Sequence, residues 1–200
     1  MKILGIYFTY NSRLKNDLNF DATLKPLKKT LNNRQWRNLT VLGKIQIIQT
    51  FAMPKLMFRA SVLTFDKDFF KKLNTALFNF VWKGKDKIKR LALVSDYSDG
   101  GLKIPHLEST IKTQRIMCLK KFIENYHCPW KLILSHHLKY YGDKFLLHCN
   151  YDVPDLPKSL PKFYRECFQA WATLTEKQPT SRGHVIEQIL WNNKHIRIDV

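Results

Sequence analysis

Residues 66–84 have the sequence DKDFFKKLNTALFNFVWKG and carry the clearest helix signal in the chain. Their apolar residues recur at the three- and four-residue spacing of one helix face: Phe69, Leu73, Leu77 and Phe80. Asp66 suits the N-cap position, because its carboxylate can accept a hydrogen bond from a backbone N–H of the first turn. Gly84 can adopt the left-handed conformation that often ends a helix. The stretch therefore predicts an amphipathic helix between these two residues.

The segments around this stretch show similar periodicity, and the chain has only 7 glycines in 200 residues. We expect a short helix that begins near Asp21, and a helix over Thr40–Met53 that is buried on more than one side and that Pro54 ends or kinks. Apolar residues at helical spacing predict further helices in three regions: 116–126, 130–141 and 164–174. The sequence therefore predicts a mainly α chain.

The opening segment Lys2–Tyr10 departs from this pattern, because it is rich in β-branched and aromatic residues and is followed by Asn11 and Ser12. It predicts a single short β-strand. One strand alone leaves unpaired backbone groups on both edges. We therefore expect it to pair with a strand elsewhere, upstream or later in the chain.

The charge of the chain is strongly positive. There are 34 Lys+Arg and 16 Asp+Glu, a net charge of +18, and the pI is about 9.8. Residues 1–100 hold 19 basic and 7 acidic residues, a net +12, whereas residues 101–200 hold 15 and 9, a net +6. A hydrophobic fraction of 44% excludes a disordered polybasic tail. A folded, basic N-terminal half favours polyanions as partners.

The sequence gives no sign of a membrane or secretory protein. Its longest stretches without a charged residue, such as Leu73–Trp82, are half of what a bilayer-spanning helix needs. No cleavage site follows the short apolar opening. We expect a cytoplasmic or nuclear protein that is not secreted and has no membrane partner.

Four cysteines lie far apart in the C-terminal half: Cys118, Cys128, Cys149 and Cys167. They form no Cys-x-x-Cys pair, and their spacing to the nearby histidines is not that of a zinc finger. Their density is also too low for a disulfide scaffold. The pattern predicts free thiols and no metal site.

Basic residues interleaved with aromatic residues are the positive functional signal, because lysine and arginine can neutralise phosphates and release counterions. The candidate contacts are Arg37, Lys44, Lys55, Arg59, Lys83, Lys85, Lys87, Lys89 and Arg90. Such contacts give an affinity that depends on salt and is largely blind to sequence. The run Lys83–Arg90 has an alternative interpretation as a solvated loop.

Three residues in this region have competing interpretations. Trp36 and Trp82 occupy apolar-stripe positions, which favours packing in the core over stacking on a base or sugar. Gly43 lies within a predicted helix, where glycine costs about 1 kcal/mol relative to alanine. It therefore indicates the close approach of another backbone, which is either a packed helix or a nucleic-acid strand.

Five short motifs occur in a definite order: Ile3-Leu4-Gly5-Ile6, Trp36 with Leu39-Thr40 and Gly43-Lys44, Pro54-Lys55-Leu56, Phe78-Asn79-Phe80-Val81-Trp82, and Gly100-Gly101-Leu102-Lys103-Ile104-Pro105. This order resembles the reverse transcriptases of LINE-type non-LTR retrotransposons, in the region just after the catalytic palm. The resemblance covers about residues 1–126. Trp171 and Leu190-Trp191-Asn192 are similar, with lower specificity, to the more variable region downstream.

The resemblance implies a helical, thumb-like bundle with one short strand left from the palm sheet and a smaller helical segment after it. The expected parts are a palm-strand remnant (1–12), a thumb-like domain (13–128), a helical extension (129–149), a Pro-rich connector (150–161) and a C-terminal helical segment (162–200). The connector is the expected subdomain boundary. Scaffold roles are implied for Trp36, Leu39, Gly43, Pro54, Trp82, Gly100, Gly101 and Pro105.

The resemblance also implies that no catalytic residue lies in this sequence. Family members carry metal-binding aspartates, including a Phe/Tyr-x-Asp-Asp motif, upstream of the strand that begins here at Lys2. This sequence has no such motif, so it cannot assemble a two-metal phosphoryl-transfer site. We expect no cofactor in this chain, although the parent family uses Mg²⁺ in the palm.

The expected function is therefore that of a truncated reverse-transcriptase fragment, without polymerase activity by itself, that binds template–primer or other nucleic acid through the phosphate backbone. The expected partners are RNA, DNA or an RNA/DNA duplex, and the missing palm and fingers of a longer polyprotein. Two alternatives stay open. One is a structural or protein-interaction remnant without a nucleic-acid role. The other is part of a full RNA-directed DNA polymerase that gene modelling has cut short.

Overall fold

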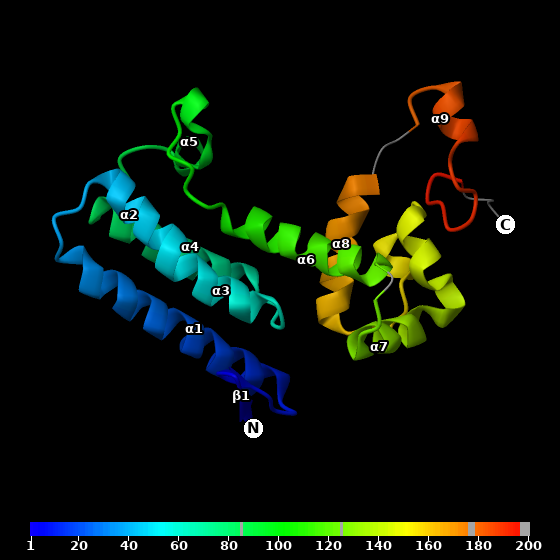
Figure 1. Ribbon diagram of the computed structural model, residues 1–200, viewed down its shortest axis with the longest axis horizontal. Helices are drawn as coiled ribbons and strands as arrows, with labels where there is room; N and C mark the ends of the chain where they lie inside the picture. The colour runs from blue at the N-terminus through cyan, green and yellow to red at the C-terminus, as the bar shows by residue number, and fades with distance from the viewer. Residues whose placement is uncertain (85, 125, 176–178, 197–200) are drawn as a thin grey trace. The chain divides into compact units, whose positions relative to one another are not determined.

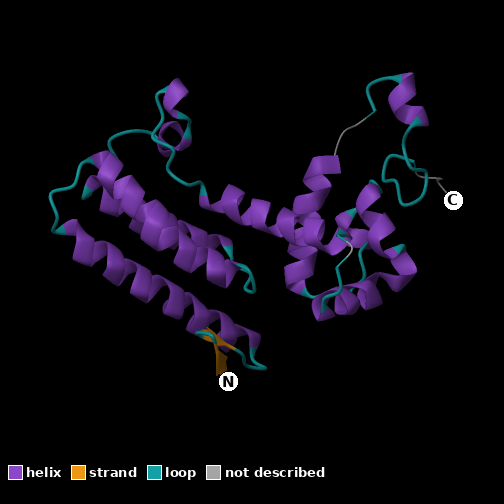
Figure 2. Ribbon diagram, viewed as in Figure 1, coloured by secondary structure: helices purple, strands orange, loops and turns teal. Residues whose placement is uncertain are grey.

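The computed structural model describes residues 1–84, 86–124, 126–175 and 179–196. In this part of the chain, helices connected by loops account for the secondary structure apart from one small hairpin at the N-terminus (Figures 1 and 2). The prediction of a mainly α fold is therefore confirmed. The chain divides into two compact units, Met1–Ile111 and Lys112–Val200.

The N-terminal segment forms a hairpin, so the prediction of a single strand is wrong. Strand β1 (Lys2–Ile3) pairs antiparallel with β2 (Ile6–Tyr7). Between them Leu4 and Gly5 have φ angles of 47° and 81°. Two consecutive left-handed residues form the tight turn that matches the twist of a two-residue hairpin. The opening segment therefore supplies its own pairing partner.

A side chain completes the other edge of this hairpin. The buried amide of Asn19 accepts a hydrogen bond from the backbone N–H of Tyr7 and donates one to its carbonyl, both at 2.9 Å. These are the bonds that a neighbouring strand would make. The hairpin is thereby attached to the first helix of the same unit.

Helix α1 (Ser12–Gln35) begins nine residues before the predicted start near Asp21. The side chain of Asn11 is its N-cap and accepts hydrogen bonds from the backbone N–H groups of Arg13 and Leu14, at 3.0 and 3.1 Å. Pro26 lies inside the helix without ending it. The sequence prediction assigned Asn11 to the end of a strand and therefore overlooked its capping role.

The next helices form a continuous rod over Val41–Ala60, which we call the α2–α3 rod. It consists of α2 (Val41–Ile47), the π-helical segment η1 (Ile48–Ala52) and α3 (Met53–Ala60). Proline opposes a regular α-turn because it lacks an N–H and its ring crowds the preceding turn. In this rod the wider π-turn ends two residues before Pro54. Pro54 therefore coincides with a distortion of the helix and does not end it.

Helix α4 (Lys67–Trp82) confirms the start predicted at Asp66, whose Oδ1 accepts a 2.7 Å hydrogen bond from the backbone N–H of Phe69. The four residues of the predicted apolar stripe are buried. The end differs by one residue, because Lys83, with φ of 55°, takes the left-handed position that was expected at Gly84.

The core of the first unit lies between α1, the α2–α3 rod and α4 (Figure 1). Its most deeply buried large side chains are Leu27, Ile45, Ile48, Leu56, Phe69, Leu73, Leu77 and Leu107. The unit closes with α5 (Arg90–Val94), the 3-10 turn η2 (Tyr97–Asp99) and the start of α6 (Leu107–Ile123).

The second unit contains the remainder of α6, followed by α7 (Pro129–Leu138), α8 (Lys162–Thr175) and α9 (Arg182–Ile186). Three 3-10 segments lie between α7 and α8: η3 (Lys139–Tyr141), η4 (Asp143–His148) and η5 (Val153–Asp155). Proline at the first position of α7 begins that helix, as its missing N–H allows.

The two units divide at Ile111, not at the Pro-rich segment 150–161 that was the expected boundary. Leu156 and Leu160 of that segment are buried in the same core as Phe122 and Phe168. Pro154 lies in the 3-10 segment η5, so the segment is not extended throughout, and its leucines anchor it to the second unit. None of the described helices has the length and apolar character to cross a bilayer.

Candidate nucleic-acid interface

Lys44 does not reach the surface, although the sequence predicted a phosphate contact. Its side chain is 7% exposed, and its Nζ donates a 2.7 Å hydrogen bond to the carbonyl of Val81 in the last turn of α4. The carbonyls of a final turn lack partners within the helix and carry its negative dipole end. Lys44 therefore caps α4, and its assignment as a backbone contact is corrected. The helical spacing contained the signal, because Lys44 lies one turn before the fully buried Ile48.

Burial lowers the pKa of the Lys44 ammonium, and the nearby Lys83 and Lys87 lower it further. The three cations are thus close enough to interact at the C-terminal end of α4. Lys83, Lys87 and Lys89 are exposed there, and we call them the α4-end lysines. Among the described residues none of these three has an ion-pair partner. Lys85, predicted as a contact in the same loop, lies outside the described residues.

Arg90 has its own partners in this loop. Its Nε lies 2.8 Å from Asp86 Oδ2, and its guanidinium carbon lies 4.6 Å from the centre of the Phe78 ring. Arg90 remains exposed. A phosphate would therefore compete with Asp86 for this side chain, whereas the α4-end lysines are available without that competition.

Arg59 lies under the hairpin rather than on an open surface. A Cβ at Gly5 would lie 3.7 Å from its Nη2, and its Nη1 is buried without a hydrogen-bond partner in the described part of the chain. Burial lowers the pKa of this guanidinium, while Tyr7 opposes the shift. Along the α2–α3 rod, Arg59 is 15 residues or about 22 Å from Lys44. The predicted contacts therefore do not form one cluster.

Two further predicted contacts are exposed. Lys55 on α3 donates a 3.0 Å hydrogen bond to the hydroxyl of Thr30 on α1. Arg37 lies in the turn between α1 and α2. Both side chains can therefore reach an external phosphate. For Lys55 this requires exchange of its exposed hydrogen bond to the Thr30 hydroxyl.

Trp36 is 90% exposed, so its expected place in the core is wrong. It is the C-cap of α1, and its backbone N–H donates to the carbonyl of Arg34. The helix ends at this residue, so Trp36 does not lie on the buried helix face that the apolar periodicity predicted for it. An uncovered indole next to Arg37 is a surface on which a base could stack. Trp82, in contrast, packs half-buried against the core of the first unit.

Gly43 does not meet another backbone at close range. The nearest atoms to a Cβ built there are Thr40 Oγ1 at 3.5 Å and side-chain atoms of Leu39 at 3.7 Å. The Gly43 N–H donates to Thr40 Oγ1, so the glycine belongs to the capped first turn of α2. The interpretation that a packed helix approaches Gly43 is thereby corrected, whereas the approach of a nucleic-acid strand stays a prediction. Leu39 is half-buried beside it, and Pro54 is exposed on the rod.

The Gly100-Gly101 pair closes a turn against α5. Gly100 is left-handed, with φ of 74°, and a Cβ at Gly101 would lie 2.0 Å from the carbonyl oxygen of Ser95. The chain then runs back along α5, because Leu102 and Ile104 both donate backbone hydrogen bonds to Leu93. It continues through the half-buried Pro105 into α6.

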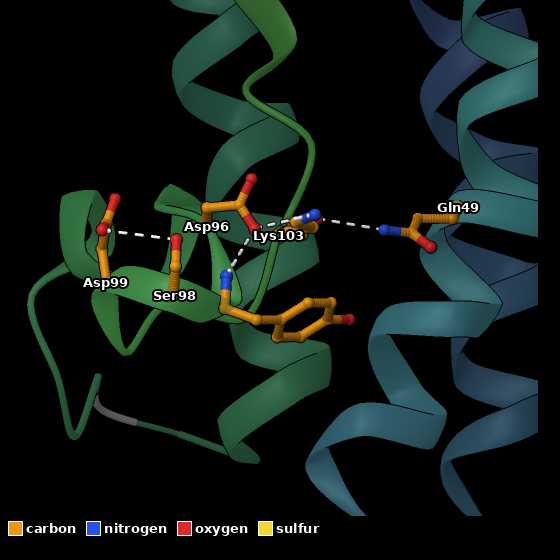
Figure 3. A network of polar contacts seen from close by, with 6 residues as sticks. Gln49, Asp96, Ser98, Asp99 and Lys103 are labelled. Atoms are coloured by element: carbon orange, nitrogen blue, oxygen red, sulfur yellow. Dashed lines mark hydrogen bonds and ion pairs between the residues drawn. The ribbon is translucent and has the colours of Figure 1, made fainter.

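A polar network holds this turn to the α2–α3 rod (Figure 3). Lys103 Nζ lies 2.7 Å from Asp96 Oδ1, and Gln49 on η1 donates a 3.0 Å hydrogen bond to the Lys103 carbonyl. The hydrogen bonds from Lys103 and from the Tyr97 N–H lower the pKa of Asp96. Asp99 accepts from the Ser98 hydroxyl at 3.4 Å. Asp96 and Asp99 therefore make contacts that stabilise this turn.

Within the described ranges, no group of three or more His, Cys, Asp or Glu side chains is arranged to hold a metal ion. No known protein-family model matches the chain.

Proposed function

We propose that this chain is the thumb-like region of a LINE-type reverse transcriptase and that it binds template–primer or other nucleic acid through the phosphate backbone. It has no polymerase activity by itself. The observation that carries the proposal is the net charge of +12 in residues 1–100 together with the exposed α4-end lysines, which have no ion-pair partner among the described residues. The ordered motifs support the family, and the charge supports the binding.

The geometry revises the set of contacts. Of the nine predicted contacts, Lys44 is buried, Arg59 is covered and Lys85 lies outside the described residues. Six exposed cations are left: Arg37, Lys55, Lys83, Lys87, Lys89 and Arg90. If all six meet phosphates of a duplex, log K should fall with log salt at a slope of about −5. The exposed Trp36 adds a stacking surface for an unpaired base at the α1–α2 turn.

The test is a salt titration of binding to a fluorescent RNA/DNA primer–template, measured by anisotropy. The triple variant Lys83→Ala, Lys87→Ala, Lys89→Ala should make the slope shallower by about 3. A matched control removes the same charge from exposed lysines of the second unit, with Lys112→Ala, Lys120→Ala and Lys158→Ala, and should leave the slope unchanged. Absence of binding at low salt, or equal effects of the two triples, contradicts the proposal.

A second candidate is a protein-interaction role for the hairpin. Met1, Ile3 and Leu4 are 84%, 44% and 80% exposed and Tyr10 is fully exposed, so several large apolar side chains are open to solvent at this end of the chain. In this alternative the hairpin packs against a palm or fingers region and the basic surface has no ligand. Analytical ultracentrifugation discriminates, because self-association that Leu4→Ser abolishes, without nucleic-acid affinity, favours this alternative.

A further inference from the structure

A hollow of about 200 Å³ lies between α1 and α4 in the first unit, and we call it the α1–α4 hollow. The buried side chains of Leu31 on α1 and Phe80 on α4 form its floor. The two helices run in the same direction. Near their starts Phe20 packs on Phe69, with ring centres 4.9 Å apart, and Leu31 and Phe80 lie about three turns further along each helix. The hollow therefore lies toward the end of α4 that leads to the α4-end lysines.

Three amide side chains line the rim of the hollow. Asn32 and Gln35 lie one turn apart on α1, and Asn79 lies on α4. None of the three has a side-chain hydrogen bond in the described part of the chain. Each amide offers two N–H donors and a carbonyl acceptor. The rim can therefore bind a polar group that carries donors as well as acceptors.

The lining favours a ligand that is uncharged where it enters the hollow. Among the described residues that form it, the only charged side chain is Lys28, and the small side chain of Ala76 leaves the space open. A phosphate or carboxylate would instead favour several cations around it. A nucleobase has ring faces that stack on apolar side chains and an edge of donors and acceptors that asparagine and glutamine can pair with. The apolar floor and the amide rim fit these two parts of a base.

Exposed cations lie on both sides of the hollow. Lys28 precedes Leu31 on α1, and Lys83 follows Phe80 at the end of α4, so the parallel helices place the two lysines toward opposite ends. Neither has an ion-pair partner among the described residues. An uncharged hollow between two available cations matches the arrangement of one base and its adjoining phosphates in a nucleic-acid strand.

The concave shape distinguishes an unpaired base from a duplex. In a duplex the base edges are recessed in the grooves, whereas an unpaired base can be splayed out and enter a pocket. We propose that the α1–α4 hollow binds one unpaired nucleobase of a single-stranded segment, with the base edge at the three amides and the ring against the apolar floor. Lys28 and Lys83 bind the adjoining phosphates. This inference rests on the proposed function and adds a base site to its phosphate contacts.

The experiment measures the affinity of the full chain for three fluorescent ligands by anisotropy. The ligands are a blunt RNA/DNA duplex, the same duplex with a single-stranded overhang, and the same overhang built from abasic nucleotides. The abasic overhang keeps the sugars and phosphates, so the comparison isolates the bases. We expect the wild-type chain to bind the normal overhang at least about fivefold more tightly than the abasic one. Equal affinity for the two overhangs would overturn the proposal.

Two variants change the hollow in different ways. Ala76→Leu fills it, and should weaken binding to the normal overhang by about fivefold while the abasic overhang and the blunt duplex bind as before. The double variant Asn32→Ala, Asn79→Ala removes two exposed amides and should have the same effect, so the test does not depend on a larger side chain being tolerated at position 76. The matched control is Asn33→Ala, Thr75→Ala, which changes exposed residues of the same helices outside the hollow and should bind like the wild type.

The outcomes separate this inference from the proposed function. Unchanged overhang affinity in both hollow variants, or an equal loss in the control, would overturn the inference and assign the base contact to another surface such as Trp36. The proposed function would still stand if the blunt duplex bound with the salt slope that the α4-end lysines create. Absence of binding to all three ligands would contradict both.

Discussion

The Nζ of Lys44 lies 2.7 Å from the carbonyl oxygen of Val81, and this contact joins the first turn of the α2–α3 rod to the last turn of α4. A buried cation here satisfies a carbonyl that the helix itself leaves unpaired. The sequence predicted that Lys44 contacts a phosphate. Its hydrogen bond makes it part of the support for the exposed α4-end lysines, which occupy the loop that α4 leads into.

Replacing Lys44 with methionine should therefore change stability more than binding. The substitution keeps most of the apolar stem and leaves the Val81 carbonyl buried without its donor, which costs about 1 to 3 kcal/mol. Urea unfolding measures that loss. The salt slope of nucleic-acid binding should stay unchanged, because the buried ammonium meets no phosphate.

Lys83→Met is the matched control for this prediction. Lys83 is exposed, so the free energy of unfolding should change by less than about 0.5 kcal/mol. The slope of log K against log salt should become shallower by about 0.9. If Lys44→Met flattened the salt response and Lys83→Met did not, the roles assigned to these two lysines would be reversed.

Trp36→Ala should separate single-stranded from duplex binding, and this prediction rests on the proposed function. The indole is 90% exposed, so its removal should change the free energy of unfolding by less than about 0.5 kcal/mol. Loss of stacking on one base should weaken binding to a primer–template with an unpaired overhang by about 1 kcal/mol, or about fivefold. Affinity for a blunt duplex should not change, and Trp36→Phe should retain most of the overhang preference. Equal losses on both ligands would argue against stacking.

Local signals in the sequence predicted local structure well. The Asp66 cap and the apolar stripe of α4 depend on residues within one or two turns of each other, and both are confirmed. The turn at Leu4-Gly5 was also local but was missed, because the surrounding β-branched residues favour a strand whether or not it reverses. Asn11 was missed for a related reason, since it can end a strand as well as begin a helix.

The fate of single polar or aromatic residues could not be predicted in this way. Lys44 and Lys83 are both lysines beside a glycine, yet one is buried against Val81 and the other is open to solvent. Trp36 and Trp82 both continue an apolar pattern. Helix α1, however, ends just before Trp36, and the Trp36 side chain is exposed. These outcomes depend on where α4 lies against the α2–α3 rod, and periodicity within one helix carries no information about that packing.

The two adjacent glycines of the α5 turn should respond differently to alanine. A methyl group at Gly101 would lie 2.0 Å from the Ser95 carbonyl oxygen, so the backbone itself must move. We expect Gly101→Ala to cost about 3 kcal/mol or more in the free energy of unfolding. A Cβ at Gly100 would meet no atom within 4 Å, so the only cost of alanine there is its left-handed φ. Gly100→Ala should therefore lower the free energy of unfolding by about 1 kcal/mol. Urea denaturation of both variants measures the difference, and equal costs would contradict the close approach to Ser95.

The contribution of Asp96 to stability should vanish in acid. Its pKa is lowered in the folded chain, first by the hydrogen bond from Lys103 and then by the Tyr97 N–H, from an ordinary value of 3.8. A depressed carboxylate pKa gives stability that is fully present above the unfolded value and is lost as the pH falls through the folded one. The hydrogen bond with Asp96 raises the pKa of Lys103 above its ordinary value of 10.5. The contribution of Lys103 to stability therefore persists through neutral pH and is lost only above that value. Wild-type chain and Asp96→Asn should therefore differ in urea midpoint at neutral pH and converge below pH 3.8.

Asp99→Asn is the control, because it removes the same charge from the same turn without breaking the contact to Lys103. Its midpoint should follow that of the wild type across the acid range. A difference between wild type and Asp96→Asn that persisted or widened in acid would place the effect in packing of the turn. The convergence therefore distinguishes the ionised carboxylate, bound by Lys103 and Tyr97, from the mere shape of the Asp96 side chain.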